Sequence, residues 1–373
     1  MTKGYSTKEN SISRSVTDRQ HFLDVLRVAA TCAVVLMHTL TGAVDAVDIS
    51  QYPTERLVYL VSMDLITWCV PVFILISGYL FLSPGRHISF TQMLKKYCRR
   101  IVLALFLFGV PYAILELMLL EKNFRISMLW KGVLMVLQGK SWSHMWYLYL
   151  ILVLYLITPA LKWLLERVPK TCVYGIMAIL FVGSSLFPFL NKFLNLSLPV
   201  LPDGGIYFFY YICGHLFACS RKDADEKQIV SDAKLPAGEK GTGRMGVVEA
   251  ILIVIVLIGM VVSRTMGNFS LQMAYNYPFT VLISILVFDV AKRCKLNLGE
   301  KAAAAWQGAG SLCFTIYLVH PVFVNVLYKF MHISLLDFPI GISLPLFFVV
   351  ILMFAASTAW ILCKMPVLKK YVL

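Results

Sequence analysis

Residues 22–44, FLDVLRVAATCAVVLMHTLTGAV, form the first long apolar run of the chain and contain two basic side chains, Arg27 and His38. A helix would turn through about 1,100° between them, close to three full turns, and would rise about 16 Å. Arg27 and His38 should therefore share one helix face at two depths. Because a charged side chain inside a membrane usually faces a bundle interior or a wet cavity, this face is the first functional-site hypothesis.

The composition predicts an all-α, polytopic integral membrane bundle of about ten transmembrane helices. The chain has 373 residues, of which 59% are hydrophobic and only 14% are charged, whereas a soluble domain is about a quarter charged. The apolar residues occur in blocks separated by polar loops. The expected spans are 22–44, 57–82, 101–120, 146–165, 171–190, 206–219, 246–263, 277–291, 310–330 and 341–363.

The distribution of charge predicts the orientation of the chain. The net charge is +14, and the Lys and Arg residues lie mostly in alternate loops, which is how a membrane protein fixes its topology, with the basic loops in the cytoplasm. Both termini should be cytoplasmic, and the bilayer, not nucleic acid, accounts for the charge. We expect a cytoplasmic tail over 1–20, a transmembrane domain over 21–373, and a flexible cytoplasmic loop over 220–245.

The nine cysteines are scattered, mostly through apolar runs, and no C-x-x-C motif occurs. This pattern supports neither a disulfide framework nor a zinc site, so we expect small buried side chains and no bound metal.

His38 is the first choice for a catalytic base. A neutral imidazole in the outer half of a span can accept a proton from a hydroxyl, although a histidine hydrogen-bonded between helices would look the same in the sequence. Asp24 lies three residues before Arg27, so the two can pair. Arg27 is therefore either half of a structural pair with Asp24 or a ligand-binding arginine.

Two further stretches place histidines and aromatic residues in or beside spans. His144 and Trp146 open the fourth span, where they either anchor the helix at the interface or line the mouth of an acceptor pocket. Tyr317 and His320 lie in the ninth span. A histidine at that depth needs a partner, and a structural hydrogen bond between helices is as good an explanation as a functional role.

The stretch Ser77-Gly78-Tyr79 lies near the cytoplasmic end of the second span. Gly78 can allow close helix packing, and Ser77 and Tyr79 are candidates for lining a pocket. Ser77 lacks the strand–turn–helix context of a nucleophile elbow, so we do not expect it to be a nucleophile.

Five motifs in this order resemble the acyltransferase family 3 membrane proteins, which include bacterial O-acetyltransferases of surface polysaccharides. The motifs cover about residues 20–363. They are Asp24-x-x-Arg27-x10-His38, Phe73-Ile74-Leu75-Ile76-Ser77-Gly78-Tyr79, His144-Met145-Trp146-Tyr147-Leu148, Tyr211-x-x-Gly214 and Ile316-Tyr317-Leu318-Val319-His320-Pro321.

The resemblance implies transfer of an acyl group, acetyl by first expectation, from cytoplasmic acyl-CoA to a hydroxyl of a cell-envelope acceptor. The acceptor would be a glycan or a lipid-linked molecule at the outer face of a bacterial plasma membrane. Arg27 would bind the CoA end and His38 would be the catalytic histidine. From their position at the base of the third span, we also expect Arg99 or Arg100 to assist Arg27. Acetyl-CoA would be a substrate, and no permanently bound cofactor is expected.

Two other classes of function remain open from the sequence. One is a transporter or exporter of a glycan or lipid-linked intermediate, which would need coupling charges inside the membrane. Lone acidic residues are few in the predicted spans, and they include Asp64, Glu116 and Asp289. The other is a structural or sensory subunit, which would not need Arg27 and His38 on one face. The sequence leaves open whether the chain forms a homo-oligomer.

Overall fold

The computed structural model describes residues 21–46, 48–232, 247–266, 274–294 and 298–373, and in these ranges the chain is helical with no β-strand. The predicted tail over 1–20 and most of the predicted loop lie outside the described residues. The first part of the predicted loop, residues 220–232, is helical instead, because it belongs to helix α11, Gly205–Asp232. The helices are α2 His21–Ala46, α3 Pro53–Ile66, α4 Cys69–Phe81, α5 Phe90–Gln92, α6 Arg99–Glu121, α7 Ser127–Leu137, α8 Trp146–Leu165, α9 Lys170–Phe181, α10 Phe187–Leu194, α11 Gly205–Asp232, α12 Val247–Met266, α13 Pro278–Arg293, α14 Glu300–Asn325, α15 Ile340–Lys364 and α16 Pro366–Tyr371.

Seven helical segments among the described residues are long and apolar enough to cross a membrane. They include α2 alone, α3 with α4, and α5 continued through a π-helical turn into α6. The expected spans over 206–219, 246–263 and 277–291 fall on α11, α12 and α13, which do not reach that length and hydropathy in the described residues. The protein is therefore a multi-pass helical membrane protein, as the composition predicts.

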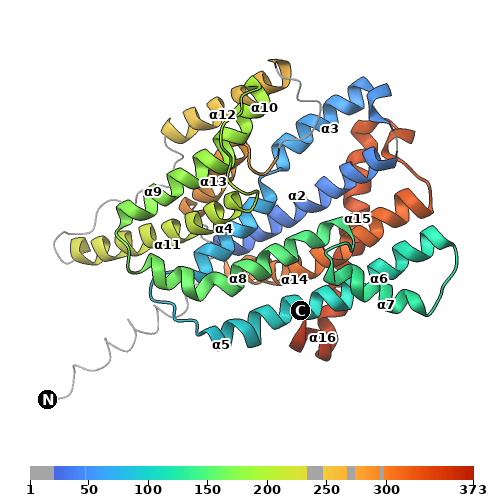
Figure 1. Ribbon diagram of the computed structural model, residues 1–373, viewed down its shortest axis with the longest axis horizontal. Coiled ribbons are helices and arrows are strands. Elements are labelled where there is room, and N and C mark those ends of the chain that lie inside the picture. The colour runs from blue at the N-terminus through green and yellow to red at the C-terminus, as the bar shows by residue number, and fades with distance from the viewer. Residues whose placement is uncertain (1–20, 47, 233–246, 267–273, 295–297) are drawn as a thin grey trace.

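The helix α2, which carries Arg27 and His38, lies in the middle of the bundle (Figure 1). It packs against α14, α4 and α15, and α14 also packs against α15. In Figure 1, α7 lies at one edge of the bundle and α12 at the opposite edge. In the described residues the buried core has one large cluster, with members from Phe22 to Val372, and a smaller one formed by Val256, Met260, Tyr277 and Leu286. This arrangement brings residues from several helices to the face of α2 that carries the two basic side chains.

The closest helix contact joins α4 to α11, and it depends on two glycines. A Cβ atom on Gly78 would lie 2.0 Å from the carbonyl oxygen of Tyr211, and one on Gly214 would lie 2.3 Å from that of Leu75. Small residues allow such close backbone approach between membrane helices. The close packing predicted at Gly78 is confirmed, and it explains why a glycine also occupies position 214.

Candidate functional site

Two cavities lie on either side of His38, and four residues line both of them. The basic cavity, defined by Arg27, Arg86 and Arg100, has a volume of about 550 Å³. The mixed-charge cavity, defined by Asp45, Glu116, Lys140 and Lys329, has a volume of about 640 Å³. Both volumes are in the usual range for small-molecule sites. The residues common to both cavities are Met37, His38, His144 and Tyr275.

Arg27 and His38 line the same basic cavity, as their helical spacing predicts. Arg27 Nη1 lies 3.1 Å from Asp24 Oδ1. The Asp24 side chain is 3% exposed, whereas that of Arg27 is 29% exposed. Arg27 can therefore both pair with Asp24 and bind a ligand, because the ion pair orients a guanidinium that still reaches the cavity.

Arg86 is a cavity residue that the sequence reasoning did not single out. Its Nη1 donates to the Leu80 carbonyl at 2.9 Å, its Nη2 donates to the Tyr97 hydroxyl at 3.3 Å, and its guanidinium lies over the Phe81 ring. It comes from the loop after α4, where a lone arginine carries no periodic signal. Only the fold shows that this loop closes the basic cavity.

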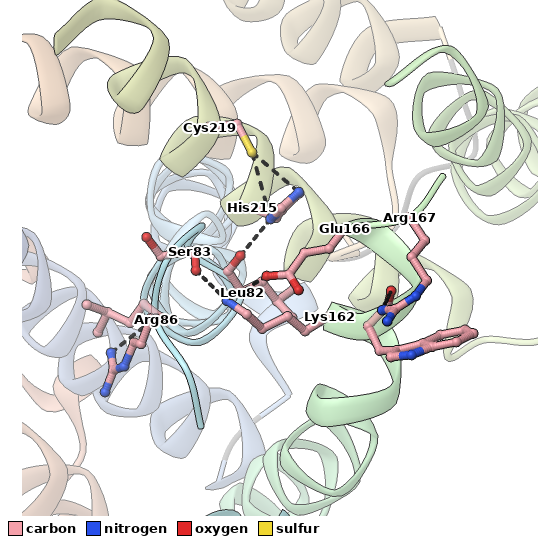
Figure 2. Close-up of polar contacts among 10 residues, drawn as sticks. Leu82, Ser83, Arg86, Lys162, Glu166, Arg167, His215 and Cys219 are labelled. Carbon is pink, nitrogen blue, oxygen red and sulfur yellow. Dashed lines mark hydrogen bonds and ion pairs between the residues drawn. The ribbon is translucent and has the colours of Figure 1, made fainter. Parts of the chain in front are cut away.

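The loop that carries Arg86 is fixed by two buried polar side chains (Figure 2). Lys162 donates to the Ser83 carbonyl and lies 3.5 Å from Glu166. The His215 Nδ1 donates to the Leu82 carbonyl at 2.7 Å. These contacts satisfy buried donors that would otherwise be costly, and they hold the start of the loop in place.

Arg100 also lines the basic cavity, but its neighbour Arg99 does not. Arg100 Nε donates to the Val372 carbonyl at 2.9 Å, and its guanidinium lies over the Phe314 ring. Arg99 is exposed and lies over the Tyr371 ring. Of the two arginines expected to assist Arg27, Arg100 is therefore the one at this cavity, because adjacent helical residues point about 100° apart.

No acidic residue is among the described residues that line the basic cavity. Three guanidinium groups face it, and its walls include aromatic residues such as Phe73, Tyr155 and Phe314. Guanidinium groups recognise phosphate oxygens in bidentate fashion. The chemistry of this cavity therefore suits a molecule with an anionic end and an apolar or slender remainder.

The three histidines of the sequence motifs meet at the boundary between the cavities. The ring centroids of His38 and His320 are 5.1 Å apart, those of His38 and His144 are 6.4 Å apart, and those of His144 and His320 are 5.9 Å apart. His320 lines neither cavity and is fully buried. No metal-binding arrangement of three or more His, Cys, Asp or Glu residues was found in the described part of the chain.

His144 contacts both cavities, but Trp146 contacts only the basic cavity. The Trp146 ring stacks on that of Tyr275, with centroids 5.8 Å apart. His144 and Trp146 therefore share only the basic cavity, and their predicted place at the mouth of an acceptor pocket stays a prediction. Tyr317 also lines the basic cavity, and its hydroxyl donates to the backbone carbonyl of His144.

Trp142 lines the mixed-charge cavity together with Tyr275 and Tyr328. Its ring stacks on Tyr112 with centroids 4.3 Å apart and planes 7° apart. Its buried Nε1 has no hydrogen-bond partner among the described residues. The sequence reasoning missed it, although it precedes His144 by two residues and could have been grouped with that motif.

Ser77 and Tyr79 separate in the structure. Ser77 lines the basic cavity, and its hydroxyl donates to the Phe73 carbonyl at 2.9 Å. Tyr79 is buried against Phe22 and Phe288 and lines neither cavity. Tyr79 therefore belongs to the helix packing rather than to a pocket.

The fold and the site together define a polytopic membrane protein with two cavities meeting at a buried histidine cluster. The acyltransferase family 3 model, described as an acyltransferase domain, matches residues 20–364. The chain therefore belongs to this family of membrane acyltransferases. No curated protein and no solved structure matches the chain.

Proposed function

We propose that the protein moves an acyl group, acetyl by preference, from cytoplasmic acyl-CoA to a hydroxyl of an extracytoplasmic cell-envelope acceptor. The observation that carries the proposal is the pair of cavities that share His38 and His144. A donor in one cavity and an acceptor in the other would have their reacting ends at the same histidine. Holding two reactants in this way lowers the entropic cost of their encounter.

The basic cavity is assigned to the acyl-CoA donor. Arg27, Arg86 and Arg100 offer planar donors to phosphate oxygens. The cavity adjoins the cluster of Lys95, Lys96 and exposed Arg99, which the distribution of positive charge assigns to the cytoplasm. The thioester then lies deeper along α2, towards His38, about 16 Å above Arg27 by helical rise.

The mixed-charge cavity is assigned to the acceptor. Its lining combines acidic and basic residues with the Trp142 ring. A rim with both signs of charge does not select a polyanion, and an aromatic ring offers a flat face for a sugar or hydrocarbon. A glycan or lipid-linked acceptor would enter from the extracytoplasmic side, in the orientation with both termini in the cytoplasm.

His38 is assigned as the general base. The acceptor hydroxyl oxygen bonds to the thioester carbonyl carbon, and the carbon–sulfur bond breaks with its electron pair going to the CoA sulfur. The hydroxyl proton passes to His38 and then to the thiolate, so that the products are an ester and the CoA thiol. General base catalysis of this kind is typically worth about 10²–10⁴ in rate.

The test is acyl transfer by the purified protein in lipid, with labelled acetyl-CoA and a cell-surface acceptor fraction. We expect His38→Ala and His38→Gln to lose at least about 100-fold in transfer while binding acetyl-CoA like the parent. An amide can hydrogen-bond but cannot take the proton at neutral pH. Full activity in His38→Gln would exclude the general-base role.

A transporter is the second candidate, because two cavities that share lining residues also resemble the two halves of a translocation path. The same vesicles distinguish the two functions. Movement of an acceptor-like molecule across the membrane, without any labelled ester formed by the parent protein, would favour transport and contradict the proposed chemistry.

A further inference from the structure

The buried histidines beside His38 present hydrogen-bond acceptors that the general-base assignment leaves unexplained. His320 is 0% exposed, and His144 is 3% exposed. The Nε2 atoms of both rings are buried and have no hydrogen-bond partner among the described residues. An unsatisfied buried polar atom costs free energy, so each such atom in a folded protein calls for an explanation.

The tautomer of His320 follows from its backbone contact. Its Nδ1 lies 3.0 Å from the Ile316 carbonyl oxygen, one helical turn earlier on α14. A carbonyl oxygen only accepts hydrogen bonds, so Nδ1 carries the proton and Nε2 carries a free lone pair. The Nε2 atom of His144 is likewise buried without a hydrogen-bond partner in the described part of the chain.

Neutral His38 cannot serve both of these Nε2 atoms. A neutral imidazole has one N–H donor, whereas an imidazolium has two. The nitrogen of His38 that takes the hydroxyl proton must face the acceptor and the thiolate, so the other ring nitrogen, which already carries an N–H in the neutral base, is the donor available to a neighbouring histidine. That hydrogen bond becomes stronger when His38 is an imidazolium, because its donor is then charged. The centroids of His38 and His320 are 5.1 Å apart, which allows a direct imidazole–imidazole hydrogen bond after a small ring rotation, whereas His144, at 6.4 Å, is too far from His38 for a direct hydrogen bond and contacts the pair from the side.

We propose that His320, assisted by His144, is a positioning residue that accepts a hydrogen bond from His38 and stabilises its imidazolium form during acyl transfer. This inference rests on the proposed function of His38. Preorganised partners aimed at a charge that develops during the reaction are a major source of catalysis. The hydrogen bond from His38 to His320 is weaker while His38 is neutral and strongest once His38 carries the proton.

The experiment compares His320→Phe with His320→Gln in lipid vesicles. Phenylalanine keeps a ring of similar shape but has no lone pair, whereas the glutamine amide oxygen can accept a hydrogen bond. We expect kcat to fall about 10- to 100-fold in His320→Phe, a share of the 10²–10⁴ that a general base supplies. The KM for acetyl-CoA should stay within about twofold, and His320→Gln should recover most of kcat.

A second nucleophile separates positioning from structural damage. Hydroxylamine attacks a thioester as a neutral amine and needs no base to remove a proton first. We expect His320→Phe to transfer the acyl group to hydroxylamine at the parent rate while it remains slow with the hydroxyl acceptor. Equal losses with both nucleophiles, or no recovery in His320→Gln, would overturn the inference.

Two outcomes distinguish failure of this inference from failure of the proposed function. A parent protein that transfers no acyl group overturns both. A parent that transfers normally, together with a fully active His320→Phe, overturns only the role of His320. If His320→Phe does not accumulate in the membrane, His144→Phe and His320→Gln are compared with the same two nucleophiles, with acetyl-CoA binding as the check on folding.

Discussion

The two cavities have similar volumes, about 550 and 640 Å³, but opposite kinds of lining. In the described residues, three arginines and no acidic residue line the basic cavity. The mixed-charge cavity is lined by Asp45 and Glu116 together with Lys140 and Lys329. The volume of a cavity therefore does not identify its ligand in this protein. The sign and pairing of the charges separate a site for a polyanion from a site for a polar acceptor.

The charges of the mixed-charge cavity also neutralise one another locally. Lys329 Nζ lies 3.7 Å from Glu116 Oε2, in a pair whose side chains are 51% and 34% exposed. Exposed pairs of this kind add little stability. By contrast, Arg86 donates to the Leu80 carbonyl and Arg100 to the Val372 carbonyl. Of the three cavity arginines, Arg27 pairs with an acidic side chain, that of Asp24, which does not line the cavity. The basic cavity thus keeps its positive potential for a ligand.

The largest expected effect concerns which cavity faces the cytoplasm. Cys172, near the start of α9, and Cys294, directly after α13, are exposed and lie at helix ends expected to face the cytoplasm. We expect an impermeant maleimide to leave both cysteines, and an added Val230→Cys, unlabelled in intact cells and to label them after permeabilisation. Ser197→Cys, on the opposite side, should label in intact cells as the control. External labelling at position 230 would reverse the assignment of donor and acceptor.

Removal of single cavity arginines should weaken donor binding about 10- to 100-fold, because a hydrogen bond to a charged group contributes roughly 1.5–3 kcal/mol. Arg27→Ala, Arg86→Ala and Arg100→Ala should each show this loss in titrations of the purified protein with acetyl-CoA. Arg27→Lys should also bind more weakly, because it keeps the charge but loses the planar fork. The matched control is Arg99→Ala, which removes an equal charge next to Arg100 but outside the cavity.

The salt dependence sharpens the same comparison. Added salt should weaken acetyl-CoA binding to the parent more than it weakens acceptor binding, since screening acts on unpaired exposed charge. If Arg27→Ala binds acetyl-CoA as tightly as the parent, that arginine has no part in donor recognition. If Arg99→Ala weakens binding as much as Arg100→Ala, the effect is one of general surface charge.

The smallest expected effect is at Trp142 in the mixed-charge cavity. Stacking on Tyr112 holds the Trp142 ring in place. A contact between this ring and the acceptor should contribute roughly 0.5–1.5 kcal/mol to acceptor binding. Trp142→Ala should therefore raise the KM for the acceptor by about 2- to 10-fold and leave acetyl-CoA binding unchanged. Trp142→Phe keeps a ring but removes the indole N–H, so comparing the two variants separates stacking from hydrogen bonding. A change in donor binding alone would contradict the division between the cavities.

Much of the site could be predicted because it depends on local periodicity. Arg27 and His38 share a cavity because eleven helical residues return to nearly the same face. The packing at Gly78 was also predictable from residue size. Arg86, Trp142 and the lining residues Met37 and Tyr275 were not found, since their roles arise from contacts between segments far apart in the chain.

The sequence by itself determined the class of protein, the helix that carries Arg27 and His38, and the family to which its motifs point. Hydropathy, helical spacing and loop charge are properties of neighbouring residues, so they can be read without a fold. Only the tertiary structure decided that His144 and His320 meet His38, that Tyr79 packs away from the cavities, and that Arg100 faces a cavity while Arg99 does not. Those outcomes depend on how the helices pack and rotate against one another, which is set by the fit of many distant side chains.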